Sequence, residues 1–342
     1  MVRAMRLPKH APSARRLIST AARWLLLAAC LLAVALPRFN RQDPGVIRKL
    51  SLATVAFPHS RPLDVEGYVR LTEFFRGHTP ADSLIAPFCF RPLVPFAASV
   101  LPVDAPSAVN VINLLCLMLT VLALDRILSF LGYAVRARTL GCLLFIVSFP
   151  TFYYGTIGFV DPAAVMFVTL GIYAALKGRW VLLGAITVLG VLAKETVGIV
   201  ALLPILRTRR QIALAALLSG LAVLTLAWVR ALLPGHHFLW LPSLRTILDN
   251  AARPRTYLTF LLTVGPLLAL ALAGAWKRRL TPGSHFFWAG FALALAVYVY
   301  SLFSTYADGR SVWTAVPFLV PLAVSLFARA DANPGLATSA HR

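Results

Sequence analysis

Residues 17–36, LISTAARWLLLAACLLAVAL, form an apolar run of the length that a helix needs to cross a hydrocarbon core about 30 Å thick. The run follows five basic residues, Arg3, Arg6, Lys9, Arg15 and Arg16. Because Lys and Arg stay on the cytoplasmic side, the pattern predicts an internal N-terminus and a first helix directed outward. A cleaved signal peptide is the alternative, since Ala33-Val34-Ala35 resembles a cleavage site, although the preceding segment is long for one.

The same kind of run recurs along the 342 residues, of which 59% are hydrophobic and 13% charged. The mean hydropathy is +0.78. A soluble domain is roughly half apolar and about a quarter charged, so this composition excludes one. We predict an all-α, polytopic membrane bundle over residues 1–330 and a disordered cytoplasmic tail over 331–342. About ten spans are expected, the first at 17–36 and the others at 106–124, 139–157, 160–176, 180–193, 196–206, 211–233, 257–275, 285–303 and 312–328.

Charge is distributed unevenly between the two predicted sides of the bundle. Inner loops and tails hold 18 Lys and Arg but only two acids, Asp125 and Asp331, whereas the other ten Asp and Glu lie on or near the outer side. The basic bias predicts that both termini are cytoplasmic, but segregation of acids is not part of that rule. We therefore expect the outer carboxylates to serve chemistry.

The formal charge of +21 does not indicate a nucleic-acid partner. A protein that binds DNA or RNA concentrates Lys and Arg on one face. Here the basic residues occur in twos and threes between apolar blocks, as cytoplasmic loops do.

Two regions differ from ordinary spans. Residues 37–104 form the first outer loop, where alternating apolar and charged residues over 64–76 predict an interfacial amphipathic helix, and a proline-rich half-helix follows. The segments 180–193 and 196–206 are too short for two full spans. Because basic clusters flank the pair on both sides, we expect a tight hairpin.

Charged groups at membrane depth are costly, so each one is a functional candidate. In the first outer loop, Asp64 begins the expected interfacial helix, near Glu66 and Tyr68. The alternatives are a helix cap for Asp64 and an exposed i,i+4 pair with Arg70 for Glu66. Arg91 lies between aromatics and prolines, where it either snorkels to lipid headgroups or binds a phosphate.

Further candidates lie at the outer ends of later spans. Asp161 precedes Pro162, which is also a good helix start. Lys194 and Glu195 occupy the hairpin tip and, being adjacent, cannot form one simple salt bridge on a helix. Arg310 follows Asp308 and could simply pair with it. His236-His237 is expected to be an ordinary loop pair, because no third metal ligand is indicated.

These motifs occur in a distinctive order: Asp64 in the first outer loop, FRPLVP at 90–95, DP at 161–162, LAKET at 192–196, LLP at 202–204, and GR at 309–310 before Pro317. The order resembles the GT-C class of membrane glycosyltransferases, which take sugars from polyprenyl-phosphate carriers. The class includes protein O-mannosyltransferases and lipid A aminoarabinose transferases. One departure is that many members carry two adjacent acids in the first loop, whereas Val65 separates Asp64 from Glu66 here.

The resemblance implies an inverting transfer of a hexosyl or pentosyl group from a polyprenyl-phosphate sugar. The acceptor would be a cell-envelope glycan, lipid or protein at the outer face of the bacterial inner membrane. Asp64 is expected to be the base and Asp161 to support it or to bind the acceptor or a metal. A divalent ion is compatible with such carboxylates but not required by the sequence. The expected substrate-binding residues are Glu66, Tyr68, Arg91, Lys194, Glu195 and Arg310.

Two other functions stay open. A transporter or flippase for a lipid-linked sugar predicts charges near the midplane of several helices and often repeat symmetry. A non-catalytic assembly factor of a cell-surface polysaccharide system would keep the fold without turnover.

Overall fold

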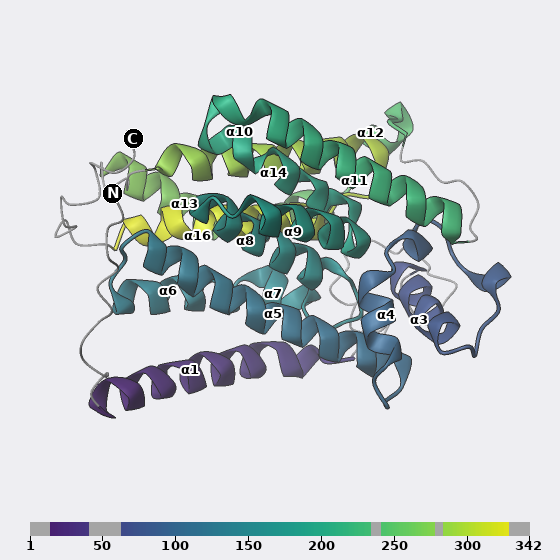
Figure 1. The fold of residues 1–342 in the computed structure, drawn as a ribbon, viewed down its shortest axis with the longest axis horizontal. Helices are drawn as coiled ribbons and strands as arrows, with labels where there is room; N and C mark the ends of the chain where they lie inside the picture. Colours follow the sequence, from purple (N-terminus) through teal and green to yellow (C-terminus); the bar gives the residue numbers. More distant parts are fainter. Residues whose placement is uncertain (1–13, 41–62, 234–240, 278–282, 328–342) are drawn as a thin grey trace, which may run out of the picture.

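The computed structural model describes residues 14–40, 63–233, 241–277 and 283–327 (Figure 1). These residues are 82% helical and contain no strand, which confirms the all-α class. The expected tail at 331–342 and the pair His236-His237 lie outside them.

The α-helices are α1 (Ala14–Ala35), α3 (Leu63–Phe75), α4 (Leu93–Ser99), α5 (Ala105–Phe130), α6 (Val135–Ile146), α7 (Phe149–Tyr154), α8 (Asp161–Lys177), α9 (Trp180–Ala193), α10 (Leu203–Arg207), α11 (Ile212–Leu232), α12 (Leu244–Ala251), α13 (Pro254–Trp276), α14 (Ser284–Ser304), α15 (Gly309–Val312) and α16 (Val316–Ser325). Short 3-10 helices connect them: η1 (Leu36–Arg38), η2 (Ala81–Ser83), η3 (Phe88–Phe90), η4 (Glu195–Leu202), η5 (Arg209–Gln211) and η6 (Trp313–Ala315).

Five helical segments of the described chain are long and apolar enough to cross a membrane. Their outward faces keep large apolar side chains exposed, such as Val223, Leu224 and Trp228 on α11. Apolar patches of this extent on a protein surface indicate contact with lipid or a partner. Together these features indicate a multi-pass helical membrane protein. The five segments are Ser19–Arg38, Ala105–Phe130, Arg209–Leu232, Pro254–Trp276 and Ser284–Ser304.

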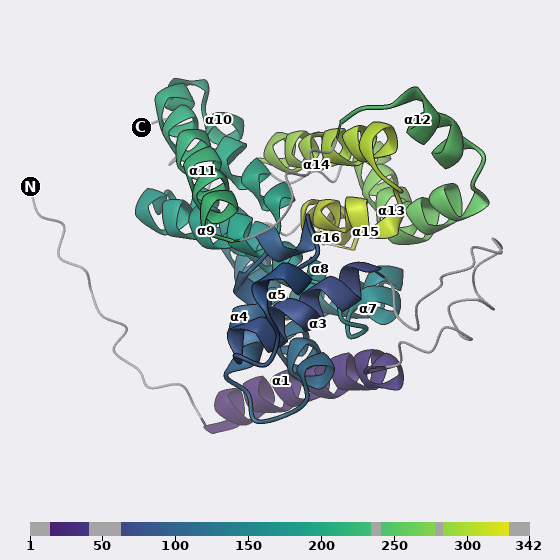
Figure 2. The ribbon, with the colours of Figure 1, turned by 90° about the vertical axis from the view of Figure 1, so that its right-hand side faces the viewer.

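The core lies around α16 and α8 (Figure 2). All ten residues of α16 are buried, as are thirteen residues of α8. The neighbours α5, α6, α13 and α14 surround them, and α1 lies at the periphery (Figure 2). A helix that is apolar on every side is expected in the interior of a bundle.

Helix ends follow local sequence signals. Asp104 caps α5 by accepting a hydrogen bond from the backbone N–H of Ser107 at 3.0 Å. Gly178 ends α8 with a left-handed φ of 66°, a conformation that favours glycine. The stretch 139–157, predicted as one span, is divided into α6 and α7. The break lies at Ser148, and Pro150 enters the first turn of α7.

Short elements gather at one end of the bundle, hereafter the outer end. Helix α3 buries Val65, Tyr68 and Leu71 on one face, which is the periodicity expected for the predicted interfacial helix. The hairpin is also present: α9 ends at Ala193, Lys194 is extended, and η4 packs back on α9. Such short helices and turns can direct side chains toward a common point.

Candidate functional site

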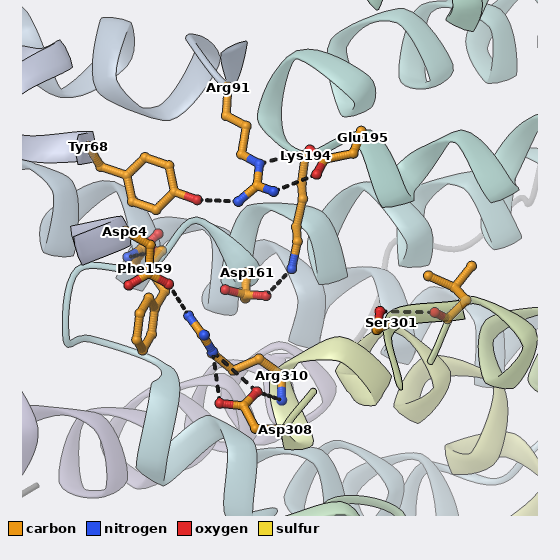
Figure 3. Close-up of polar contacts among 12 residues, drawn as sticks. Asp64, Tyr68, Arg91, Phe159, Asp161, Lys194, Glu195, Ser301, Asp308 and Arg310 are labelled. Atoms are coloured by element: carbon orange, nitrogen blue, oxygen red, sulfur yellow. Dashed lines mark hydrogen bonds and ion pairs between the residues drawn. The ribbon is translucent and has the colours of Figure 1, made fainter. Parts of the chain in front are cut away.

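Seven of the predicted site residues meet at the outer end, although they come from five regions of the chain (Figure 3). They are Asp64 and Tyr68 on α3, Arg91 after η3, Asp161 at the start of α8, Lys194 and Glu195 at the hairpin, and Arg310 on α15. Their polar ends form three groups of hydrogen bonds and ion pairs, hereafter the outer network (Figure 3).

The first group joins α3 to α15. Arg310 donates from Nη1 to Oδ2 of Asp64, and its Nε lies 3.3 and 3.2 Å from the two carboxylate oxygens of Asp308. The guanidinium also stacks over the ring of Phe159, 3.8 Å from its centre. Arg310 and Asp64 remain partly open, with 22% and 16% of their side-chain surface exposed. One guanidinium therefore lies between two carboxylates, the partly open Asp64 and the buried Asp308.

The second group is the pair of Lys194 and Asp161. The ammonium donates from Nζ to Oδ1 of Asp161 at 2.5 Å. Asp161 is the first residue of α8 and Pro162 lies in its first turn, which confirms the helix start that the sequence predicts. A buried carboxylate needs a cationic partner, and Lys194 provides it from an element 33 residues away.

The third group joins the hairpin to α3 through Arg91. Its Nε donates to Oε2 of Glu195 at 2.8 Å, and Nη2 donates to Oε1 of the same carboxylate. The remaining nitrogen, Nη1, donates to the Tyr68 hydroxyl at 2.5 Å. This two-pronged pairing fixes the plane of the guanidinium. Arg91 is buried, so the alternative of snorkelling to headgroups does not describe it.

Burial and neighbouring charge act on this third group in opposite directions. Burial, the largest single effect, raises the pKa of Glu195, but the charge and hydrogen bonds of Arg91, with a backbone hydrogen bond and Lys194, together bring that pKa to about 2. Burial is also the largest effect on Tyr68 and raises its pKa far above the ordinary value. The charges of Arg91, Asp64 and Asp161 all act on the Tyr68 phenol. Each of these residues belongs to a different group of the outer network, so the three groups of the network lie within electrostatic reach of one another. Tyr68 is therefore a neutral hydroxyl between ionised groups.

Glu66 is placed differently from the other predicted residues. It accepts a hydrogen bond from Arg70 Nε at 3.0 Å, one turn along α3. This is the i,i+4 pair that the sequence offered as the simpler interpretation.

Asp308 was not among the predicted site residues, although it contacts Arg310 directly. Its side chain also accepts from the backbone N–H of Arg310 at 3.0 Å, and Arg255 lies 3.8 Å away. The signal was available in the sequence, because Asp308 and Arg310 lie two residues apart in an outer loop. Asn250 on α12 holds this loop by donating to the carbonyls of Leu302 and Thr305.

The outer network is balanced in charge. Four acids face four cations: Asp64, Asp161, Glu195 and Asp308 against Arg91, Lys194, Arg255 and Arg310. Among the described residues, no three His, Cys, Asp or Glu side chains come close enough to hold a metal ion. Carboxylates that already bind cations are poorly suited to a divalent ion. An anion with several oxygens, in contrast, can replace a carboxylate as the partner of Arg or Lys.

Comparisons of the chain with protein-family models, with curated proteins and with solved structures found no match.

Proposed function

We propose that this protein is an inverting glycosyltransferase. It would move a sugar from a polyprenyl-phosphate carrier to a glycan, lipid or protein acceptor of the cell envelope. The observation that carries the proposal is the convergence of Asp64, Asp161, Lys194 and Arg310 in one network (Figure 3). This chemistry needs a carboxylate that accepts a proton, and cations that bind a departing phosphate.

The proposal includes a membrane topology. The chain crosses the bacterial inner membrane about ten times, with both termini cytoplasmic and the outer network at the periplasmic surface. The Lys/Arg bias supports that orientation. The spans shorter than a full crossing, such as α9 with η4, would then form a hairpin that enters from the inner side and carries Lys194 at its outer tip.

In the proposed reaction, the acceptor hydroxyl attacks the anomeric carbon while Asp64 takes its proton. The new bond joins the acceptor oxygen to that carbon, and the bond between the carbon and the phosphate oxygen breaks. The electron pair leaves with the polyprenyl phosphate, whose charge is met by Arg310, Lys194 and Arg91. A single displacement from one face inverts the configuration of the sugar.

Arg310 pairs with Asp64, the proposed base, so binding of the donor at Arg310 would change the surroundings of that base. With no substrate bound, Arg310 neutralises Asp64. A donor phosphate competes for the same guanidinium and draws it toward Asp308 and the phosphate. Asp64 then loses its ion-pair partner and is free to accept the proton of the acceptor hydroxyl. Asp161 is the more buried acid and would position Lys194.

Reconstituted protein tests the proposal. Wild type and Asp64→Asn are mixed with a labelled polyprenyl-phosphate sugar and a membrane fraction as acceptor, and label transfer is followed. We expect Asp64→Asn to lose about 10²–10⁴-fold in turnover, the usual contribution of a positioned acid or base. Asp82→Asn is the matched control, because Asp82 is an exposed acid of the same outer loop.

The outcomes separate the functions. Equal turnover by wild type and Asp64→Asn would contradict the role of Asp64. Failure of wild type to transfer label from any polyprenyl-phosphate sugar would favour the non-catalytic assembly factor. Movement of an unchanged donor across the vesicle membrane would favour a flippase. The ion pairs of the outer network lie at the starts of α3, α8 and α15 and at the end of α9, rather than in the middle of several helices, which favours transfer over transport.

A further inference from the structure

A groove opens at the other end of the bundle, hereafter the inner end. It lies between α1, α5 and α6, where α1 and α6 begin (Figure 1). About 31 Å of helix separates Asp104, at the outer start of α5, from Asp125 in this groove, at 1.5 Å per residue. The groove is open to solvent and has a volume of about 860 Å³.

The floor of the groove is an aspartate held by two arginines. Asp125 is 1% exposed and accepts hydrogen bonds from Arg23 on α1 and from Arg138 on α6, whose Nε lies at 2.9 Å. Arg23 is held further by Thr139, which accepts from its Nε at 2.8 Å. Both guanidinium groups are thus fixed at the wall of the groove, and one positive charge remains after Asp125 is neutralised.

Two more arginines stand at the rim. Arg126 and Arg136 line the groove and are exposed, and within the described part of the chain neither takes part in a hydrogen bond or ion pair. Four arginines therefore face a single aspartate. The N-terminal end of α6 adds to the positive potential, because its N-cap residue, Ala134, has no side chain that accepts a hydrogen bond.

The groove also has an apolar lining. It consists of Trp24 on α1, whose ring centre lies 5.1 Å from the Arg23 guanidinium, and of Val135, Leu140 and Leu143 on α6. The next two residues of α1, Leu25 and Leu26, are 71% and 54% exposed. A basic groove on a helix that also exposes large apolar residues fits a ligand with an anionic head and a hydrocarbon tail.

We propose that this groove binds the phosphate-bearing headgroup of an anionic phospholipid from the leaflet at the inner end. The phosphate lies among Arg23, Arg126, Arg136 and Arg138, and an acyl chain runs along Leu25 and Leu26 of α1. Basic pockets between membrane helices are the general means of holding such headgroups. The proposal is independent of the chemistry at the outer end.

Native mass spectrometry of the full chain in detergent tests the proposal. Phosphatidylglycerol and phosphatidylcholine with identical acyl chains are titrated against wild type and the double variant Arg126→Gln/Arg136→Gln. We expect wild type to prefer phosphatidylglycerol and the double variant to bind it roughly 30-fold more weakly. The matched control is Arg209→Gln/Arg210→Gln, which removes two exposed basic residues of another predicted inner loop.

Three results would overturn the proposal. One is an unchanged lipid preference in the groove variant, and another is an equal loss in the control, which would indicate diffuse surface charge. The third is displacement of the lipid by inorganic phosphate at equal concentration, which would assign the groove to a soluble phosphate compound. Both double variants should melt at the wild-type temperature without lipid, because neither removes a partner of Asp125.

Discussion

At the inner end one carboxylate, Asp125, is enclosed by two arginines, one on α1 and one on α6. At the outer end four carboxylates face four cations, carried by helix ends and turns. Asp125 is 1% exposed, whereas the side chains of Asp64 and Glu195 are 16% and 29% exposed. Similar ion pairs therefore differ in their surroundings. The enclosed carboxylate joins two helices, whereas Asp64 and Glu195 remain partly open to solvent, which suits them to contact a ligand.

The largest expected effect is a difference in stability between a variant of Asp125 and a variant of Asp64. We expect Asp125→Ala to lower the free energy of unfolding by about 3–5 kcal/mol, because two arginines lose a buried partner. Asp64→Ala should cost less than about 1 kcal/mol, because Arg310 keeps Asp308 and both groups are partly solvated. Unfolding in mixed micelles with increasing dodecyl sulfate measures both. Equal losses would remove the distinction between the two ends.

A second variant tests whether the outer network needs a fixed position of Arg310, because it moves the backbone that carries this residue. A methyl group at Gly309 would overlap Thr263 and approach the carbonyl oxygen of Thr259 to 2.7 Å. Gly309→Ala should therefore cost about 1–3 kcal/mol of stability, the usual cost of overpacking, and reduce transfer. Gly220→Ala on α11 is the control, since no atom lies within 4 Å of an added methyl group there. A stable, fully active Gly309→Ala protein would show that Arg310 needs no fixed backbone.

The smallest effect is a pH dependence at the outer end. The pKa of Glu195 falls from 4.5 to about 2 on folding, since the ion pair and hydrogen bonds with Arg91, a backbone hydrogen bond and the charge of Lys194 together outweigh burial. A depressed pKa stabilises the fold above the unfolded value, so this contribution is complete above about pH 4.5 and disappears as pH falls toward 2. Melting temperatures of wild type and Glu195→Gln between pH 6 and 3 measure it. We expect their difference to shrink on acidification, and a constant difference would contradict the pairing.

Much of the fold was predictable because the length and position of an apolar run in the sequence indicate the length and position of a helix. The predicted segment 180–193 coincides with α9, and 160–176 differs from α8 by one residue at each end. The segment 196–206 was less accurate. It is mostly the 3-10 helix η4 followed by α10, because hydropathy does not distinguish helix types. Five segments, rather than ten, have the length and hydropathy of a full span in the described chain.

The candidate site was predictable in its members but not in its pairings. Asp64, Asp161 and Lys194 were identified because charge at membrane depth is costly. Their partners depend on tertiary structure: Asp64 pairs with a residue 246 positions away. Asp308 was missed as a site residue because local pairing with Arg310 explained it, although Arg310 bridges it to Asp64.

The position of α16 has a consequence for how the protein is made. It follows all the other described helices in sequence, yet all of its residues are buried at the centre. During synthesis the earlier helices therefore emerge first and must leave room for the last one. Arg310 lies just before α16, so the outer network receives its last member only after the helices that carry the others have been synthesised.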